Sequence, residues 1–357
     1  MQIRMSRALL LIAALTGAGC GHSEPFTADS DPALAAPLLS APPVRLTFDN
    51  GMDRFATWST DENAIWYSFQ PGARTDGDVC LATMPSTGGT RTEFCAESQA
   101  SLAMRDAYER ATPGPGGQLL YGRYTSNIGM LTLYLGWLEL ATVDAPLTGR
   151  SLLSLPNNIG GIGFNHIGRI RWTASDRIVV VAEDETVIPH CTGCSKRDTI
   201  FQGYGLLEGR ITADDASFSL IPGTQNASDF TFSVAGDSIY FSQWEDPLSP
   251  TGNGRSVWVV PSGGGVPRPV YNAPQPIRSL TRTGTKLMLA LADRIVLVDL
   301  TTAAAQTIVN NGLSGTPGYG TVTASADGCR VLAEFARPQG LTFETNVFLL
   351  TGAFSGC

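Results

Sequence analysis

The cysteines are the residues whose chemistry is easiest to infer in this 357-residue chain, which contains seven of them. Cys20 directly follows an N-terminal apolar segment, and the others are Cys80, Cys95, Cys191, Cys194, Cys329 and Cys357. An even number of cysteines beyond a secretion signal is typical of a disulfide framework formed in an oxidising compartment. We therefore expect disulfides, with partners that depend on the fold.

His190, Cys191 and Cys194 form a His-Cys-x-x-Cys sequence that two other kinds of chemistry could use. A redox-active Cys-x-x-Cys motif is typical of a βαβ unit, and this sequence predicts no βαβ unit. A structural zinc ion needs four ligands, and the other histidines of the chain are His22 and His166. We favour a small disulfide that stiffens a loop, and we predict neither a bound metal nor another cofactor.

No familiar catalytic motif is present elsewhere. The sequence lacks a Gly-x-Ser-x-Gly nucleophile elbow, a phosphate-binding loop and a His-Glu-x-x-His zinc motif. The net charge is −8 and no basic stripe stands out. We therefore expect no nucleic-acid partner, because such a partner needs a positive footprint.

The N-terminus carries a secretion signal. Arg4 and Arg7 precede the apolar run of residues 8–15, which is too short to span a bilayer, and small residues lead to Cys20. This arrangement resembles the lipobox of bacterial lipoproteins, in which the cysteine is acylated, although Gly17 stands where that family usually has leucine. The resemblance implies a signal peptide over residues 1–19 and a lipid anchor at Cys20.

Two alternatives for the location follow from this signal. Ordinary cleavage near Ala18 would leave Cys20 unmodified and the protein secreted. With the anchor, the chain would be held at a bacterial membrane, on its periplasmic face or at the cell surface. Residues 20–42 are rich in Pro, Ala, Ser and Asp without periodicity, which predicts a flexible tether. In both cases we expect an extracytoplasmic protein.

Beyond the tether, a pattern of four short strands recurs at intervals of about 43 to 60 residues, the range of propeller blades. The first unit begins with residues 55–58, a polar turn and residues 64–69, and the fourth with residues 230–233 and 238–241. Both contain a Pro-Ser-x-Gly-Gly turn between their third and fourth strands. The 39 glycines and 22 prolines also favour many short strands joined by turns.

Six such units predict an all-β fold, a six-bladed β-propeller of four-stranded antiparallel blades over residues 43–357. The last unit lacks a fourth strand of its own, and residues 44–48 alternate like a strand without a place in the first unit. We predict that this segment completes the last blade and closes the ring, which removes an exposed sheet edge. The turns 58–61 and 325–328, with the Gly-Gly hairpins, resemble the TolB-like six-bladed propeller family.

The predicted blades assign partners to four cysteines. Cys80 and Cys95 lie symmetrically about a tight turn, so an antiparallel hairpin places them opposite each other. Cys329 opens the second strand of the last blade, and Cys357 follows the neighbouring third strand. We therefore expect a Cys80–Cys95 bridge and a Cys329–Cys357 bridge that fixes the C-terminus.

One face of the predicted disc carries the long connections between second and third strands, over residues 70–78, 123–130, 183–202, 243–255 and 337–345. Long ordered loops on a rigid scaffold are where binding residues concentrate. Our candidates for a binding face are Arg74, Asp76, Glu183, Asp184, Glu185, Lys196, Arg197, Trp244, Asp246 and Arg255. Calcium binding by the acidic triple 183–185 is a less favoured alternative, and Trp58, Trp172 and Trp258 are expected to pack between blades.

Two functions remain open at this stage. We favour a non-catalytic binding or scaffold protein of the cell envelope, whose partner is an envelope protein or a glycan. The alternative is a propeller hydrolase or lyase with acids at the channel mouth, for which Asp53, His166 and Asp229 are placed at the starts of first strands, against Arg278 and Tyr319 elsewhere. A structural surface protein without a specific ligand is a third possibility.

Overall fold

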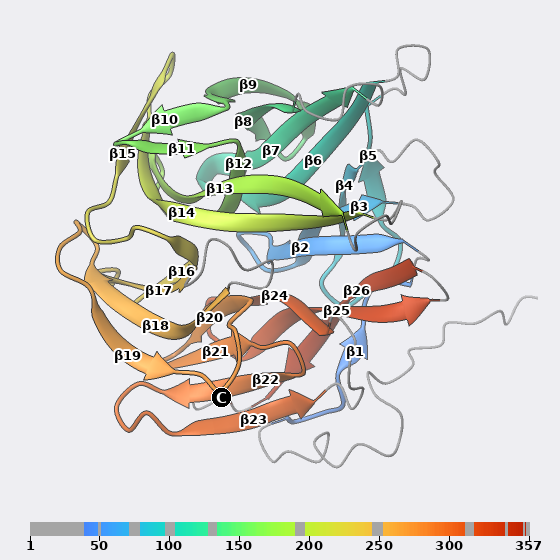
Figure 1. The fold of residues 1–357 in the computed structure, drawn as a ribbon. Helices are drawn as coiled ribbons and strands as arrows, with labels where there is room; N and C mark the ends of the chain where they lie inside the picture. The colour runs from blue at the N-terminus through green and yellow to red at the C-terminus, as the bar shows by residue number, and fades with distance from the viewer. Residues whose placement is uncertain are drawn as a thin grey trace, which may run out of the picture.

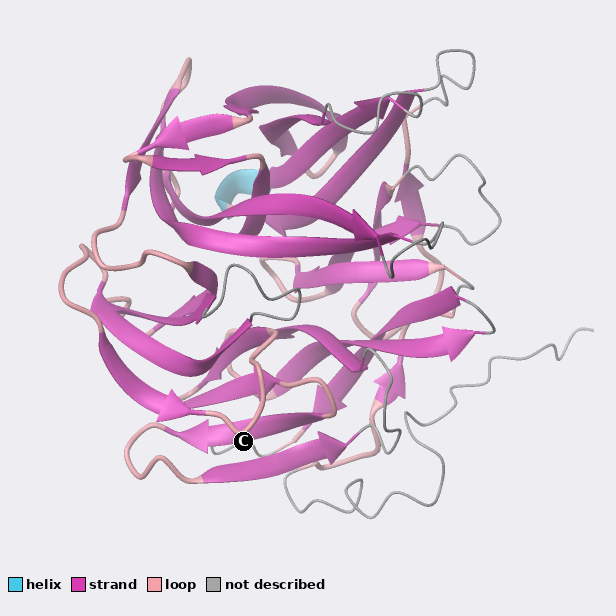
Figure 2. Cartoon of the chain, viewed as in Figure 1, coloured by secondary structure: helices cyan, strands magenta, loops and turns pink. Residues whose placement is uncertain are grey.

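The computed structural model describes residues 39–48, 51–70, 79–96, 104–127, 134–189, 197–244, 253–310, 318–339, 342–352 and 354. Within these ranges the chain is built from β-strands that radiate around a central axis (Figures 1 and 2). The only helical element described is the 3₁₀ turn η3 (Pro115–Gly117). No helix in these ranges is long and apolar enough to cross a membrane.

Most of the described strands form six blades of four strands each. The first three blades contain β2 (Met52–Trp58), β3 (Ala64–Gln70), β4 (Cys80–Pro85) and β5 (Thr92–Phe94); β6 (Met104–Pro113), β7 (Gln118–Asn127), β8 (Tyr134–Thr142) and β9 (Ala145–Leu155); and β12 (His166–Ala174), β13 (Arg177–Pro189), β14 (Arg197–Ile211) and β15 (Ala216–Leu220).

The next two blades contain β16 (Ala227–Phe232), β17 (Ser238–Trp244), β18 (Asn253–Pro261) and β19 (Arg268–Asn272); and β20 (Ser279–Thr283), β21 (Lys286–Ala290), β22 (Arg294–Asp299) and β23 (Ala305–Asn310). The last blade contains β24 (Gly318–Ala324), β25 (Arg330–Gln339), β26 (Thr342–Thr351) and the short β1 (Val44–Arg45). Neighbouring strands within each blade run antiparallel. The predicted fold class is therefore confirmed.

The ring is closed by the leading strand, as predicted. Strand β1 pairs antiparallel with β26, with Val44 opposite Leu349. The last and first blades are also joined by a short parallel contact between β26 and β2, where Thr345 is opposite Met52. Figure 1 shows β1 in blue beside the red C-terminal strands. Segments from the two ends of the chain thus share one sheet, which protects the edge of β26.

The two predicted Pro-Ser-x-Gly-Gly turns are explained by backbone conformation. Gly88 and Gly89 have φ angles of +86° and +126°, and Gly264 and Gly265 have +88° and +149°. These left-handed values are strained for residues with a Cβ atom but accessible to glycine. The turns therefore require glycine at these positions, which is why the motif could be recognised in the sequence.

Two predicted connections differ from the structure. Residues 183–202 were expected to form a loop, but β13 and β14 extend as a hairpin as far as the Pro189–Arg197 pair. Residues 337–345 are largely occupied by the ends of β25 and β26. The linker before β12 contains a small hairpin, β10 (Asn157–Ile159) and β11 (Ile162–Phe164). In the β13–β14 and β25–β26 hairpins, backbone pairing extends into residues that were expected to form loops.

The predicted Cys80–Cys95 disulfide is present, with the two Cα atoms 4.7 Å apart. Cys329 is also disulfide-bonded, whereas its expected partner Cys357 lies outside the described residues. Cys20, Cys191 and Cys194 lie outside them as well. A disulfide in a propeller of this size fits an oxidising, extracytoplasmic compartment.

Candidate functional site

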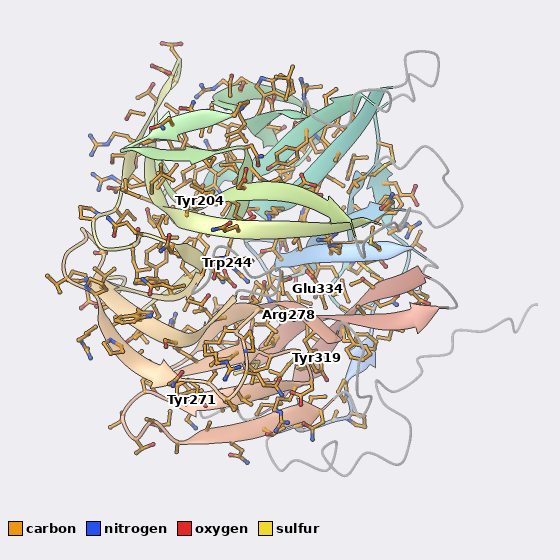
Figure 3. The ribbon with its side chains drawn as sticks, in the orientation of Figure 1. Tyr204, Trp244, Tyr271, Arg278, Tyr319 and Glu334 are labelled. Atoms are coloured by element: carbon orange, nitrogen blue, oxygen red, sulfur yellow. A yellow bond between two sulfur atoms is a disulfide. The ribbon has the colours of Figure 1, made fainter. Side chains whose placement is uncertain are left out.

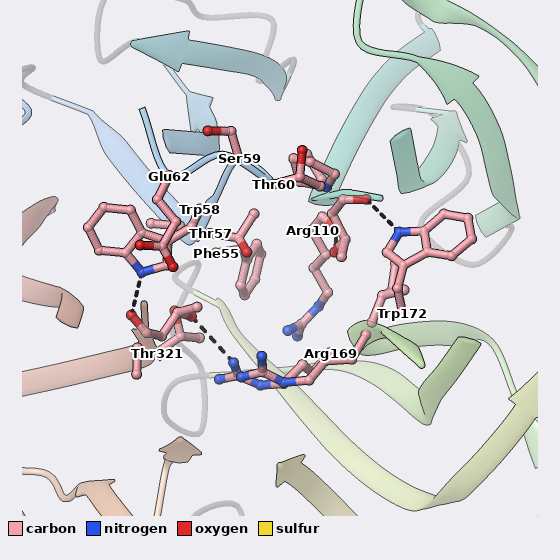
Figure 4. Close-up of a pocket in the computed structure, with 18 of the residues that line it drawn as sticks. Phe55, Thr57, Trp58, Ser59, Thr60, Glu62, Arg110, Arg169, Trp172 and Thr321 are labelled. Atoms are coloured by element: carbon pink, nitrogen blue, oxygen red, sulfur yellow. Dashed lines mark hydrogen bonds between the residues drawn. The ribbon is translucent and has the colours of Figure 1, made fainter. Parts of the chain in front are cut away.

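A cavity of about 300 Å³ lies in the central channel, between the innermost strands β2, β6, β12 and β24. Its lining residues belong to the C-terminal parts of these strands and to the turn after β2, including Ser59, Thr60 and Glu62. The cavity, called the channel pocket below, therefore opens on the face of the short first-to-second-strand turns (Figure 4). The second strands of the blades end on the opposite face.

Bulges in the innermost strands shape this pocket. The pairing register shifts between Arg54 and Thr57 in β2 and between Glu109 and Thr112 in β6. Inside these shifts Phe55 and Arg110 both have a φ of +60°, a left-handed conformation that is costly for bulky side chains. A bulge re-aims a side chain, and both residues line the pocket. Backbone strain is thus concentrated at equivalent positions of two neighbouring blades.

Arg169 forms the inner end of the pocket. Its guanidinium pairs with the carboxylate of Asp229 through Nε and through Nη2, the latter 3.0 Å from Oδ2. The same group donates to Ser279 Oγ at 2.6 Å and to the Val322 carbonyl oxygen at 3.1 Å. These partners lie in β16, β20 and β24. One side chain from the third blade therefore connects three other blades across the channel.

Asp229 is held in place independently of Arg169. Its carboxylate accepts the backbone N–H of Phe230 at 2.8 Å and that of Leu280 at 2.8 Å. A buried carboxylate with several fixed donors is pre-organised for an ion pair. The floor of the pocket is therefore a rigid feature.

Arg171, two residues closer to the mouth, differs from Arg169. It forms no ion pair with a carboxylate of the described residues, and its Nε has no hydrogen-bond partner among them. Its Nη2 makes one long contact of 3.4 Å to Thr281 Oγ1. Burial, and then repulsion from the Arg169 charge, lowers the pKa of Arg171 to about 9. Arg171 thus brings an uncompensated positive charge to the pocket.

Arg110 connects the pocket to a buried network of charges. Its Nη2 lies 3.1 Å from Glu183 Oε2, and its guanidinium covers the Phe55 ring at 4.0 Å. His166 lies 3.3 Å from Glu183 Oε2 through Nδ1 and 3.2 Å from Glu109 Oε2 through Nε2. Burial favours neutral His166, but the hydrogen bonds to Glu109 and Glu183 outweigh it and raise the pKa of His166 to about 9. The histidine is therefore a fixed cation at neutral pH.

Two tryptophans form the aromatic walls. Trp58 donates its indole N–H to the Thr323 carbonyl oxygen at 3.0 Å, and Trp172 donates to the Thr112 carbonyl oxygen at 3.2 Å. Each bond crosses from one blade to the next, so both rings are fixed and their donors are occupied (Figure 4). Both were expected to pack between blades. They do so, and they also line the pocket.

The predicted binding-face residues are not among those that line the channel pocket. Glu183, Asp184 and Glu185 lie in β13, Trp244 ends β17 as a buried side chain, and Arg255 lies exposed in β18. Arg197 begins β14. Four others lie outside the described residues: Arg74, Asp76, Lys196 and Asp246.

The acidic triple is divided by strand geometry. Successive residues of a strand point to opposite faces, which separates Asp184 from Glu183 and Glu185. The Glu183 carboxylate is occupied by Arg110 and His166. No group of three or more His, Cys, Asp or Glu side chains within the described ranges is arranged to hold a metal ion.

The three candidate catalytic residues lie at the starts of innermost strands, as expected, and all are buried. His166 and Asp229 have the ionic partners described above. Both carboxyl oxygens of Asp53 are buried without a hydrogen bond of regular geometry to a described residue. Burial, only partly offset by the nearby Thr47 hydroxyl and the Arg45 charge, raises the pKa of Asp53 to about 7. Tyr319, the second residue of the equivalent strand β24, is buried, whereas Arg278 just before β20 is exposed. Figure 3 labels both side chains.

The sequence reasoning missed the arginines of the pocket. The only local signal was the Arg169-Ile170-Arg171 alternation in the first strand of the third unit, which directs two charges to one face of a strand expected to line the channel. The counter-ion of Arg169, Asp229, comes from another blade and could not be assigned from spacing.

Comparisons with known proteins support the fold. No family model matches the sequence, and no curated protein sequence is significantly similar to it. A gluconolactonase structure from Xanthomonas campestris is 12% identical, with a TM-score of 0.54, over 92% of this chain and 94% of that one. The GH93 α-L-arabinofuranosidase of Fusarium graminearum, solved with arabinobiose, is 10% identical, with a TM-score of 0.52, over 84% of this chain and 93% of that one. At such identities the likeness shows a β-propeller and nothing about activity.

Proposed function

We propose that this chain is an exported, non-catalytic binding protein of the cell envelope whose ligand occupies the channel pocket. The observation that supports this most directly is a cavity of about 300 Å³ with a charged inner end and aromatic walls. Concave sites of this size, with a few fixed polar groups among aromatic side chains, are typical of small-ligand binding. The ligand is a small molecule or the end group of an envelope glycan or polypeptide.

Rigidity favours binding at this site. Arg169 is connected to three other blades, and the indoles of Trp58 and Trp172 are each bonded to a neighbouring blade. Such walls lose little conformational freedom when a ligand enters, which lowers the entropic cost of association. The left-handed backbone at Phe55 and Arg110 is consistent with strain retained at a functional position.

The hydrolase alternative has one supporting observation, the raised pKa of Asp53, which is a property of general acids. Two arguments favour binding instead. Asp53 is fully buried and does not line the pocket. His166, Glu183 and Asp229 are engaged in ion pairs with other side chains of the protein, so their charges already serve the fold. The similarity to a gluconolactonase and an arabinofuranosidase does not reverse this, because it is limited to the fold.

Binding at the channel pocket can be tested without knowing the natural ligand. Benzoate, benzamide and benzylamine provide anionic, neutral and cationic probes of similar size, and saturation-transfer NMR detects weak binding of each. We expect at least one probe to bind the wild-type protein and to lose binding in Thr57→Trp, which fills the pocket from β2. Arg177→Gln, an exposed residue of the same face, is the matched control. If no probe is sensitive to Thr57→Trp, the proposed function is wrong.

The envelope location is tested separately through Cys20. We expect the wild-type protein to incorporate radiolabelled palmitate and to fractionate with membranes when it is expressed in a bacterium with a lipoprotein pathway. Cys20→Ser is expected to lose the label and become a soluble exported protein. If the label is unchanged in Cys20→Ser, the cysteine is not the anchor.

A further inference from the structure

We infer that the ligand of the channel pocket is a small monocarboxylic acid with a flat, apolar body, and that Arg171 binds its carboxylate. This inference rests on the proposed function and specifies the chemical class of the ligand. It is carried by the charges that line the cavity, by the geometry of Arg171 and by the aromatic walls.

The charge balance of the pocket calls for one negative charge. Four charged side chains line it: Arg110, Arg169, Arg171 and Glu62. Arg110 is paired with Glu183, Arg169 with Asp229, and Glu62 with Arg330 at 2.6 Å. Arg171 alone among these four has no carboxylate partner in the described part of the chain. A monoanion therefore neutralises the site, whereas a dianion such as a phosphate monoester leaves an excess negative charge in a poorly solvated position.

The orientation of Arg171 suits a carboxylate. Its Nε is enclosed by the protein and has no hydrogen-bond partner among the described residues, so a ligand meets the two terminal nitrogens, of which Nη2 has one long contact, to Thr281. A guanidinium presents its donors as a planar fork, which matches the two oxygens of a carboxylate. In a site shielded from water, such a paired interaction is stronger than at the surface. Leaving these donors without an acceptor destabilises the free protein, and a bound carboxylate would remove that destabilisation.

The walls select the body of the ligand. The indole donors of Trp58 and Trp172 are already bound to the carbonyl oxygens of Thr323 and Thr112. Both rings are also supported from within the protein: the Arg330 guanidinium covers Trp58 at 4.7 Å, and a Cβ atom at Gly114 would lie only 2.2 Å from the Trp172 ring. The rings therefore offer fixed apolar surface to the cavity. An aromatic or similarly flat body fits such surfaces best.

Isothermal titration calorimetry tests this assignment. The wild-type protein is titrated with benzoate, benzamide, phenyl phosphate and acetate. We expect benzoate to bind about tenfold or more tightly than benzamide, because only benzoate pairs with Arg171. Acetate is expected to bind more weakly than benzoate because it lacks the ring. Phenyl phosphate is also expected to bind more weakly than benzoate, because it carries a second negative charge. Arg171→Gln is expected to abolish the preference for benzoate over benzamide. Arg171→Lys is expected to keep part of it, because it keeps the charge but loses the fork.

The controls separate this inference from the proposed function. Arg177→Gln, on the same face but outside the cavity, is expected to bind benzoate as the wild type does. Circular dichroism monitors folding, and Arg171→Gln is expected to remain folded because it removes an uncompensated charge. If benzamide or benzylamine binds as tightly as benzoate, and Thr57→Trp abolishes that binding, the proposed binding function stands. The assignment of a carboxylate ligand is then wrong. Undiminished benzoate binding by Arg171→Gln, or a preference for phenyl phosphate, would overturn it as well.

Discussion

Arg169 and Asp229 form a two-point ion pair between β12 of the third blade and β16 of the neighbouring fourth blade. Both side chains are almost completely enclosed, with exposed fractions of 11% and 6%. The pair closes the inner end of the channel pocket and, through Ser279, also connects the fifth blade. Its integrity therefore bears on the stability of the ring and on the shape of the candidate site.

We predict that Asp229→Asn lowers the free energy of unfolding by about 3–5 kcal/mol, because it leaves the Arg169 charge buried without its counter-ion. Ser279→Ala is the matched control, since it leaves the ion pair intact and removes only the hydrogen bonds that Ser279 Oγ accepts from Arg169 and from the Val322 N–H, at about 1 kcal/mol each. Urea denaturation followed by circular dichroism measures both. Equal losses in the two variants would show that the ion pair is not important for stability.

Asp53 should make the protein less stable as the pH rises from about 4 to 7. The pKa of Asp53 is raised to about 7, so the folded state holds the proton more tightly than the unfolded state does. The resulting stability is complete below the unfolded pKa of 3.8 and is lost as the pH passes through the folded pKa. Asp53→Asn should therefore stabilise the protein at pH 8 by about 2–4 kcal/mol relative to wild type, with little effect at pH 4. An identical pH profile of denaturation midpoints for both proteins would contradict this.

His166 should make a second contribution in the same direction at higher pH. Its pKa is raised to about 9, so its stabilisation is complete below the unfolded value of 6.5 and is lost as the pH rises through 9. The imidazole C2 proton, observed by NMR, should report a charged ring at pH 7.5. Glu183→Gln should lower the pKa of His166, because it removes one of the two carboxylates that bind the ring. A wild-type ring that titrates near 6.5 would refute the account of this network.

The Cys80–Cys95 bridge should stabilise the first blade. It closes a loop with a sequence separation of 15 residues, and a loop of this length corresponds to about 3 kcal/mol in the chain-entropy model. The double variant Cys80→Ala/Cys95→Ala should unfold at correspondingly lower urea concentration. The stability of wild-type protein treated with a reductant is measured for comparison. Its loss of stability should also include the contribution of the disulfide of Cys329. A double variant as stable as the oxidised wild type would show that the bridge constrains nothing.

The architecture could be predicted from the sequence because its signals are local. The Gly88-Gly89 and Gly264-Gly265 turns require left-handed backbone. The segment that begins at Val44 precedes the first repeat, while the last repeat lacks a fourth strand, and this indicated that the two pair. The length of the β13–β14 hairpin could not be predicted, because its outer part contains polar residues such as Asp184 whose strand pairing comes from the partner strand.

The channel pocket could not be predicted, for a related reason. Its shape depends on bulges at Phe55 and Arg110, and neither residue type favours the left-handed conformation that each adopts. Asp229, in another blade, neutralises Arg169. Arg171 has no ion pair with a described carboxylate, and this difference between the two arginines depends on the position of Asp229. A single sequence gives no indication of which side chains of different blades meet in the channel. The face with long connections was therefore the natural choice before the structure was known.

A crystal structure of the mature protein soaked with benzoate tests the central claim most directly. The account predicts electron density for the ring between Trp58 and Trp172, with the carboxylate beside Arg171. Benzoate bound only on the opposite face of the disc, with the channel pocket holding solvent alone, would contradict it.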